Sequence, residues 1–241
     1  MKRALALLAL LSSVPAFAAA PPIDFSTIGT ASTFNSVVHN TWTVDGITID
    51  AFKYAATPTY TASKLWLRTE AVPERGLGVC SEGSLCGPAA GPGYGDYNEL
   101  SNERNDEVIR LTRPDNTVWS DLWVSSLDSG GTNNNEKGIV YSSDLATPVL
   151  SGGASFSHSA LGADDGSIWS LVSAGIDPTD KYLFLRADPT NTVWGKGNND
   201  YLVWGVGVLP IPEPETYAML LAGLALLGLA ARRSNLGRLA A

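Results

Sequence analysis

The chain has 241 residues, enough for one large domain or two small ones. Its 16 lysines and arginines are outnumbered by 24 aspartates and glutamates, which gives a net charge of −8. An acidic chain without a basic cluster repels phosphate backbones, and this argues against nucleic acid as a partner.

The N-terminus has the three regions of a secretory signal peptide. A basic start is followed by an apolar run from Ala4 to Leu11 and then by small residues around position 18. We therefore predict that residues 1–20 are a signal peptide, cleaved after Ala18 or Ala20, and that the remainder is exported. A short buried helix is the alternative.

Residues 21–209 have the pattern of an all-β domain, either a β-sandwich or a jelly roll. Asp45-Gly46 lies between alternating apolar residues, which is a strong hairpin signal. Turn residues separate the later apolar runs, no helical stripe is present, and Val72–Asn105 is expected to be a long loop. The further predicted strands are Lys64–Thr69, Glu107–Thr112, Val118–Ser125, Gly138–Ser142, Ser167–Val172, Lys181–Arg186 and Tyr201–Val208.

The chain contains two cysteines, Cys80 and Cys86, which lie close together in a segment rich in glycine, serine and proline. Because an exported chain enters an oxidising compartment, we predict a disulfide between them. A metal site is the rival interpretation, but the two histidines, His39 and His158, are distant in sequence.

An acidic segment enters the predicted strand at Glu107 and offers weak candidate ligands for calcium. Glu99, Glu103 and Asp106 could supply the oxygens that hard cations prefer. The spacing is not that of an EF-hand, so a solvated acidic loop is the alternative. No other cofactor is expected.

Seven tryptophans are many for this length, and some must belong to the core. In the predicted strand Val118–Ser125, strict alternation places Trp119, Asp121 and Trp123 on one face. If exposed, that face could stack on sugar rings and bind a glycan. A strand buried on both sides is the alternative.

Catalysis has little support in the sequence. There is no Gly-x-Ser-x-Gly nucleophile elbow, and nothing orients His39 or His158 as a general base. Glycosidases use two carboxylates across a cleft, but the many acidic residues single out no pair. We predict a protein that is not an enzyme, with a secreted hydrolase as a weaker alternative.

The sheet pattern ends where a proline-rich spacer begins, at residues 210–216. The uncharged residues 217–231 are predicted to form a short transmembrane helix of about 23 Å, against a hydrocarbon core of about 30 Å. Residues 232–241 form a basic tail that opens with Arg232 and Arg233. By the positive-inside rule this tail is cytoplasmic and the β-domain lies outside.

This tail resembles the PEP-CTERM sorting signal. The resemblance rests on Pro212-Glu213-Pro214, the apolar helix and the pair Arg232-Arg233, in that order. It implies recognition by exosortase, a membrane peptidase, in a Gram-negative bacterium that makes exopolysaccharide or biofilm. It also implies at least transient contact with the inner membrane. The eight residues after Arg233 exceed what many such tails have.

The middle of the chain resembles exported β-rich domains that carry such tails, through Gly76-Leu77-Gly78-Val79-Cys80 and the segment around Asn98-Glu99-Leu100. The combined expectation is a surface or extracellular-matrix protein with a structural or adhesive role in the envelope or biofilm. The alternative is a carbohydrate-binding module that acts on exopolysaccharide.

Overall fold

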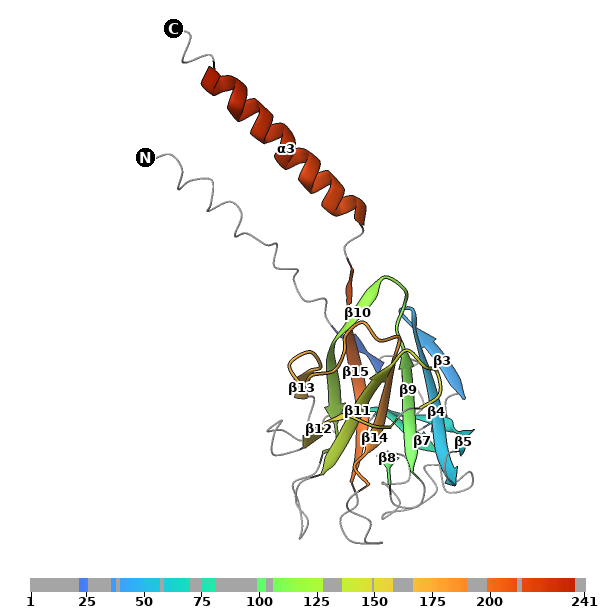
Figure 1. The fold of residues 1–241 in the computed structure, drawn as a ribbon. Helices are drawn as coiled ribbons and strands as arrows, with labels where there is room; N and C mark the ends of the chain where they lie inside the picture. The colour runs from blue at the N-terminus through green and yellow to red at the C-terminus, as the bar shows by residue number, and fades with distance from the viewer. Residues whose placement is uncertain are drawn as a thin grey trace.

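The protein folds into two antiparallel β-sheets with a helix at its C-terminal end, as seen in the computed structural model (Figure 1). The structure describes residues 22–25, 36–37, 40–56, 59–69, 75–80, 99–102, 106–127, 136–148, 150–157, 167–189, 199–211 and 214–236. The signal peptide predicted at residues 1–20 lies outside these ranges, as do His39 and His158.

The first sheet has eight strands in the order β13-β10-β15-β7-β6-β2, with β1 and β8 also paired to β15. Its strands are β1 (Ile23–Asp24), β2 (Ser36–Val37), β6 (Lys64–Thr69), β7 (Arg75–Cys80), β8 (Leu100–Ser101), β10 (Thr117–Ser125), β13 (Ser167–Ser170) and β15 (Asp200–Pro210).

The second sheet has seven strands in the order β12-β11-β14-β9-β4-β3, with β5 also paired to β4. Its strands are β3 (Thr41–Val44), β4 (Ile47–Ala56), β5 (Thr59–Ala62), β9 (Glu107–Thr112), β11 (Lys137–Ser143), β12 (Ala154–Ser157) and β14 (Tyr182–Ala187). The hairpin predicted at Asp45-Gly46 joins β3 to β4, and both turn residues have positive φ angles.

The main core lies between the two sheets. It includes Ile49 and Leu111 from the second sheet, and Leu65, Leu77 and Val203 from the first. All of these side chains are fully buried. This confirms the predicted all-β class, because the residues that alternate inward on each sheet meet in one contiguous cluster.

The prediction of a long loop over Val72–Asn105 was wrong, because β7 and β8 lie within it. All but the first residue of β7 are buried, so this strand shows no alternation of polar and apolar residues. Gly76 and Gly78 occupy the face opposite Leu77 and Val79, which further hides the pattern. Strands buried on both faces are difficult to distinguish from other apolar runs by periodicity.

The N-terminal strand β1 lies against the strand that leads out of the domain. Ile23 is opposite Val206 and Asp24 is opposite Gly205 of β15. A Cβ atom on Gly205 would lie only 2.3 Å from the backbone oxygen of Ile23, so the close approach of β1 requires glycine here. The chain therefore enters the sheet beside the strand by which it leaves.

We predict that Gly205→Ala destabilises the protein and detaches β1. The added methyl group meets backbone rather than a mobile side chain, and overpacking of this kind costs about 1–3 kcal/mol. Urea unfolding and limited proteolysis near Ile23 would measure both effects. Gly223→Ala is the matched control, since nothing lies within 4 Å of its added Cβ. Equal stability of the two variants would contradict the close approach.

Candidate functional site at the tail-side end of the sandwich

Strand β15 delivers the chain directly to the C-terminal helix. It ends at Pro210, and the N–H of Ile211 still donates a hydrogen bond of 2.8 Å to the carbonyl oxygen of Asn116. Pro210 is opposite Thr117. Hydrogen-bonded and non-bonded positions alternate along an antiparallel pair, so the proline occupies a position where its missing N–H removes no ladder bond.

The helix α3 (Pro214–Leu236) begins almost at once. Only residues 212 and 213 separate it from Ile211, so the chain between the last sheet bond and the helix spans at most about 11 Å. The folded domain and the helix are therefore joined by a very short tether.

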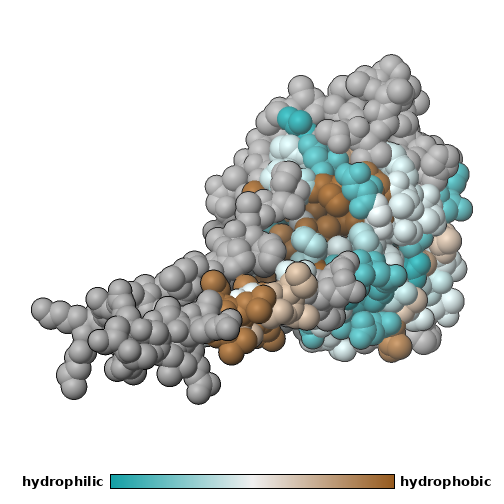
Figure 2. All heavy atoms as spheres, turned by 90° about the horizontal axis from the view of Figure 1, so that it is seen from above, coloured by the Kyte–Doolittle hydropathy of each residue, from teal (hydrophilic) through white to brown (hydrophobic). Residues whose placement is uncertain are grey.

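Helix α3 is 23 residues long and exposes its apolar side chains. Leu220, Leu221 and Leu226 are all exposed although they point in different directions around the helix, and Figure 2 shows apolar surface on this projecting segment. No helix in the described part of the chain meets the length and apolarity required to span a membrane. The side chains that the structure describes in this helix, those of residues 216 and 218–229, are all exposed, and after Thr216 they show no polar face.

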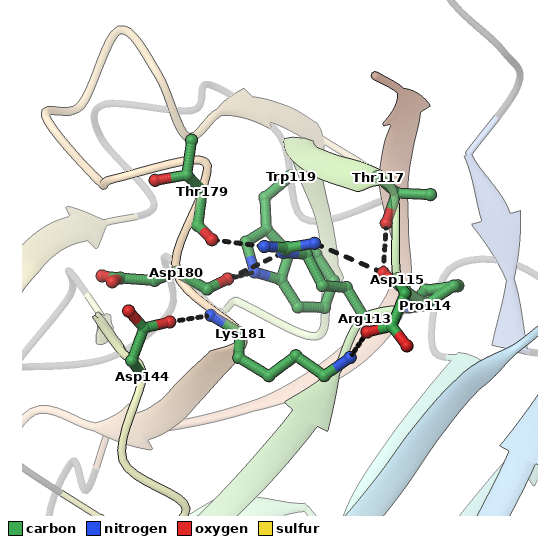
Figure 3. A network of polar contacts seen from close by, with 9 residues as sticks. All are labelled: Arg113, Pro114, Asp115, Thr117, Trp119, Asp144, Thr179, Asp180 and Lys181. Carbon is green, nitrogen blue, oxygen red and sulfur yellow. Dashed lines mark hydrogen bonds and ion pairs between the residues drawn. The ribbon is translucent and has the colours of Figure 1, made fainter. Parts of the chain in front are cut away.

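A network of polar contacts braces the end of the sandwich from which the tail leaves (Figure 3). Arg113 Nε donates to the carbonyl oxygen of Asp180 at 2.9 Å, and its Nη atoms donate to the carbonyls of Pro114 and Thr179. The guanidinium thereby ties the turn between β9 and β10 to the segment that precedes β14. We call these residues, with Trp119, the tail-side clamp.

Trp119 is the apolar component of the tail-side clamp. Its ring is fully buried, its Nε1 donates to the carbonyl oxygen of Asp180 at 2.9 Å, and its backbone N–H donates to Pro178 at 2.9 Å. Trp119 is also directly opposite Val208 of β15. The buried Trp119 is thus held by the segment before β14 at the point where it pairs with the half-buried Val208.

An ion pair lies at the exposed margin of the same network. Lys181 Nζ is 2.6 Å from Asp115 Oδ1, and the backbone N–H of Lys181 donates to Asp144 at 3.0 Å. The hydrogen bond that Lys181 Nζ donates to Asp115, together with the positive charge of Lys181, holds the pKa of Asp115 below its usual value. The Asp115 side chain is 91% exposed, so solvent screens the pair strongly.

Residues 210–234 match the family model of the PEP-CTERM protein-sorting motif. The tail is a PEP-CTERM sorting motif. No curated protein and no solved structure matched the chain. The match identifies the tail, and none of these comparisons covers the β-domain that precedes it.

The sorting motif and the folded domain overlap in sequence. The match begins at residue 210, whereas β15 extends to Pro210 and the sheet bonding extends to Ile211. Of the predicted signal residues, Pro214, Arg232 and Arg233 fall within α3. Pro212 and Glu213 lie outside the described residues. The helix extends beyond the predicted residues 217–231 at both ends.

The predicted glycan-binding face of Trp119, Asp121 and Trp123 does not form. A register shift in the pairing of β10 with β15, between Trp119 and Leu122, interrupts the alternation. As a result Trp119 and Leu122 both point into the core, and Trp119 is 0% exposed. For Trp119 the buried alternative therefore holds, whereas Asp121 and Trp123 are half-buried.

Trp123 and Trp204 form an aromatic pair on the outer face of the first sheet. Their ring centroids are 5.8 Å apart, and the guanidinium of Arg75 lies 4.7 Å from the centroid of Trp204. Trp204 Nε1 donates to Asp24 of β1 at 2.9 Å. Both rings are half-buried, and Ile168, opposite Trp123 on β13, is 55% exposed.

The candidate calcium ligands that the structure describes are engaged with arginines. Glu99 pairs with Arg68 and also accepts a hydrogen bond of 3.0 Å from Ser126, and Asp106 pairs with Arg186. Glu103 lies outside the described residues. Within the ranges that are described, no three histidine, cysteine or acidic side chains gather as a metal site would require.

Cys80 ends β7 and is disulfide-bonded. Its predicted partner Cys86 lies outside the described residues, so the pairing remains a prediction.

Sequence reasoning missed the tail-side clamp, because Arg113 and Asp180 are ordinary polar residues of turns. One signal was available: Pro114-Asp115-Asn116 is a turn sequence, and Asn116 adopts a positive φ of 58°. A tight turn there places β10 beside the end of the chain. The turn sequence does not predict which backbone oxygens accept hydrogen bonds from Arg113.

We predict that Arg113→Met lowers the free energy of unfolding by about 1–3 kcal/mol, because three carbonyl oxygens each lose a donor. Lys181→Met is the matched control on the same network and should leave stability close to that of the parent, since its partner Asp115 is exposed. Urea unfolding measures both. An equal loss in the two variants would contradict the bracing role of Arg113.

Proposed function

We propose that this chain is an exported protein that exosortase sorts to the cell envelope, the cell surface or the extracellular matrix. The observation that carries the proposal is the sorting motif at residues 210–234. A signal peptide at residues 1–20 would begin the export that the tail completes. The β-domain is then the cargo, with a structural or adhesive role in the envelope or biofilm.

The exposed helix supports handling at the inner membrane. Leucines all around α3 have no partner in the described domain, and a membrane or a membrane protein is the environment that would cover them. The uncharged stretch from Thr216 to Ala231 is only about 24 Å long as a helix, against a hydrocarbon core of about 30 Å. We therefore propose that this contact is transient and belongs to processing.

A role that does not involve catalysis is supported by how the charged side chains are used. The carboxylate of Asp50 binds Arg110 at 2.7 Å and accepts a hydrogen bond from Thr41, and Glu107 accepts one from the backbone of Ser101. Together with the pairs of Glu99 and Asp106, these contacts stabilise the sheets. Glycoside hydrolysis instead uses two carboxyl groups that face each other across a sugar-binding cleft.

The test follows the chain through export with and without residues 210–234. We expect the full chain to be processed and released from the inner membrane, and the truncated chain to escape processing. Immunoblots of cell fractions and the intact mass of the mature protein would show both. Replacement of Arg232 and Arg233 by lysine is the charge-matched control and should preserve processing. Identical products from the full and truncated chains would refute sorting through this tail.

Carbohydrate binding is the second candidate, carried by the half-buried aromatic pair Trp123 and Trp204 on the outer sheet face. Aromatic rings at a sheet surface present large rigid contact areas with a polar N–H at one edge. The exposed side chain of Ile168 extends this area beside Trp123.

We predict that the exported protein is retained by a neutral glucan or an anionic uronan, and that Trp123→Ala weakens retention about two- to twelve-fold. That range corresponds to the loss of one aromatic contact of about 0.5–1.5 kcal/mol. Affinity electrophoresis in each polysaccharide measures the effect, and a thermal melt confirms that the variant is folded. Leu145→Ala, at an exposed residue in the bend that follows β11 of the other sheet, is the control. Undiminished retention of the Trp123 variant would exclude this surface.

A further inference from the structure

The first residues of the sorting motif form part of the β-sheet of the domain. The match to the motif starts at residue 210, and Pro210 is directly opposite Thr117 of β10. The next residue, Ile211, donates its N–H to Asn116 at 2.8 Å. The first two residues of the motif, Pro210 and Ile211, are therefore paired with β10 and the residue before it.

The tether between this contact and α3 is too short for a peptidase to bind it. At most about 11 Å of chain separates Ile211 from the start of α3. Packed layers of protein lie about 10 Å apart. A peptidase that enclosed the tether between the domain and α3 would therefore need about its whole length. Enzymes that bind an extended peptide also commonly hydrogen-bond its backbone, and the N–H of Ile211 is already in use.

The contact is also of a kind that opens locally. Pro210 is exposed, Ile211 is 43% exposed, and Leu209 is only half-buried. Strand ends with exposed side chains and few buried contacts open at much lower free energy than the core. One position earlier, Val208 is opposite Trp119, which the tail-side clamp holds. The end of β15 can therefore separate from β10 between Ile211 and Leu209, and the pairing of Val208 with Trp119 resists further separation.

We propose that β10 masks the leading end of the sorting motif, and that the sorting peptidase acts only after Leu209–Ile211 separate from Asn116–Val118. The inference rests on the proposed function, because it concerns how the same tail is processed. Separation lengthens the free tether by these three residues and releases the N–H of Ile211. The folded domain thereby controls access to its own sorting signal.

A reversible crosslink tests the masking. Val118 is directly opposite Leu209, and neither residue belongs to the matched motif. Opposite residues in antiparallel strands have Cα atoms about 4.5–5.5 Å apart, within the range of about 4.4–6.8 Å that a disulfide bridges. The full chain carrying Val118→Cys and Leu209→Cys would be exported, and its processing followed by pulse-chase with and without a thiol reductant.

We expect the oxidised double variant to be processed at least about ten-fold more slowly than the parent, because the crosslink abolishes the local opening. Reductant should restore the parental rate. The single variants Val118→Cys and Leu209→Cys, treated identically, control for the substitutions and for reduction of the disulfide at Cys80.

A second variant separates masking from misfolding. Six glycine and serine residues inserted between Leu209 and Pro210 move the whole motif clear of the sheet while leaving the crosslinked positions in place. The crosslinked chain with this insertion should be processed at least as fast as the parent. If the insertion fails to restore processing of the crosslinked chain, masking is wrong and the crosslink acts by distorting the domain.

The two proposals fail in different ways. If the crosslinked chain is processed as fast as the parent, while the chain that lacks residues 210–234 is not processed, the masking proposal is overturned and sorting stands. If the truncated chain and the parent yield the same products, sorting through this tail is refuted, and masking with it.

Discussion

The pairing of β15 with β10 is the interaction on which the rest of the structure depends. β15 bonds to β10 along one edge, and its remaining pairings are with β8, β7 and β1. Two glycines permit this crowding: Gly205 admits the backbone of β1, and a Cβ on Gly207 would lie 2.3 Å from Ser120 Oγ. Because one strand joins both ends of the chain to the sheet, its position decides where the tail leaves and how firmly it is held.

The described part of the molecule divides into a folded domain and a tail helix whose apolar side chains are exposed. In the domain, buried carboxylates pair with arginines, as buried charges require, and Trp119 donates its indole N–H to a backbone carbonyl. In α3, apolar side chains cover every direction and remain exposed, which is unfavourable in water and favourable at a membrane or a membrane protein. The short tether between the two means that whatever covers the helix also approaches the tail-side clamp.

Residue alternation predicts some strands of this fold correctly and misses others. β6 and β9 have the bounds that alternation predicts, because each has one face on the core and a register set by that face. β7 was missed because it is buried throughout and its outer positions are glycines. The glycan face was misplaced because a bulge in β10 turns Trp119 and Leu122 toward the same side, and a bulge has no signature in residue type.

The sequence by itself determined the class of fold and the identity of the tail. Both are carried by local order along the chain: alternation and turn residues for the sheets, and an ordered triplet, apolar run and basic pair for the sorting motif. Only the tertiary structure decided which tryptophans are buried, which carbonyls Arg113 reaches, and that the motif begins inside the sheet. These depend on contacts between segments far apart in the chain, such as Asn116 with Ile211, whose geometry is set by strand register rather than by either segment alone.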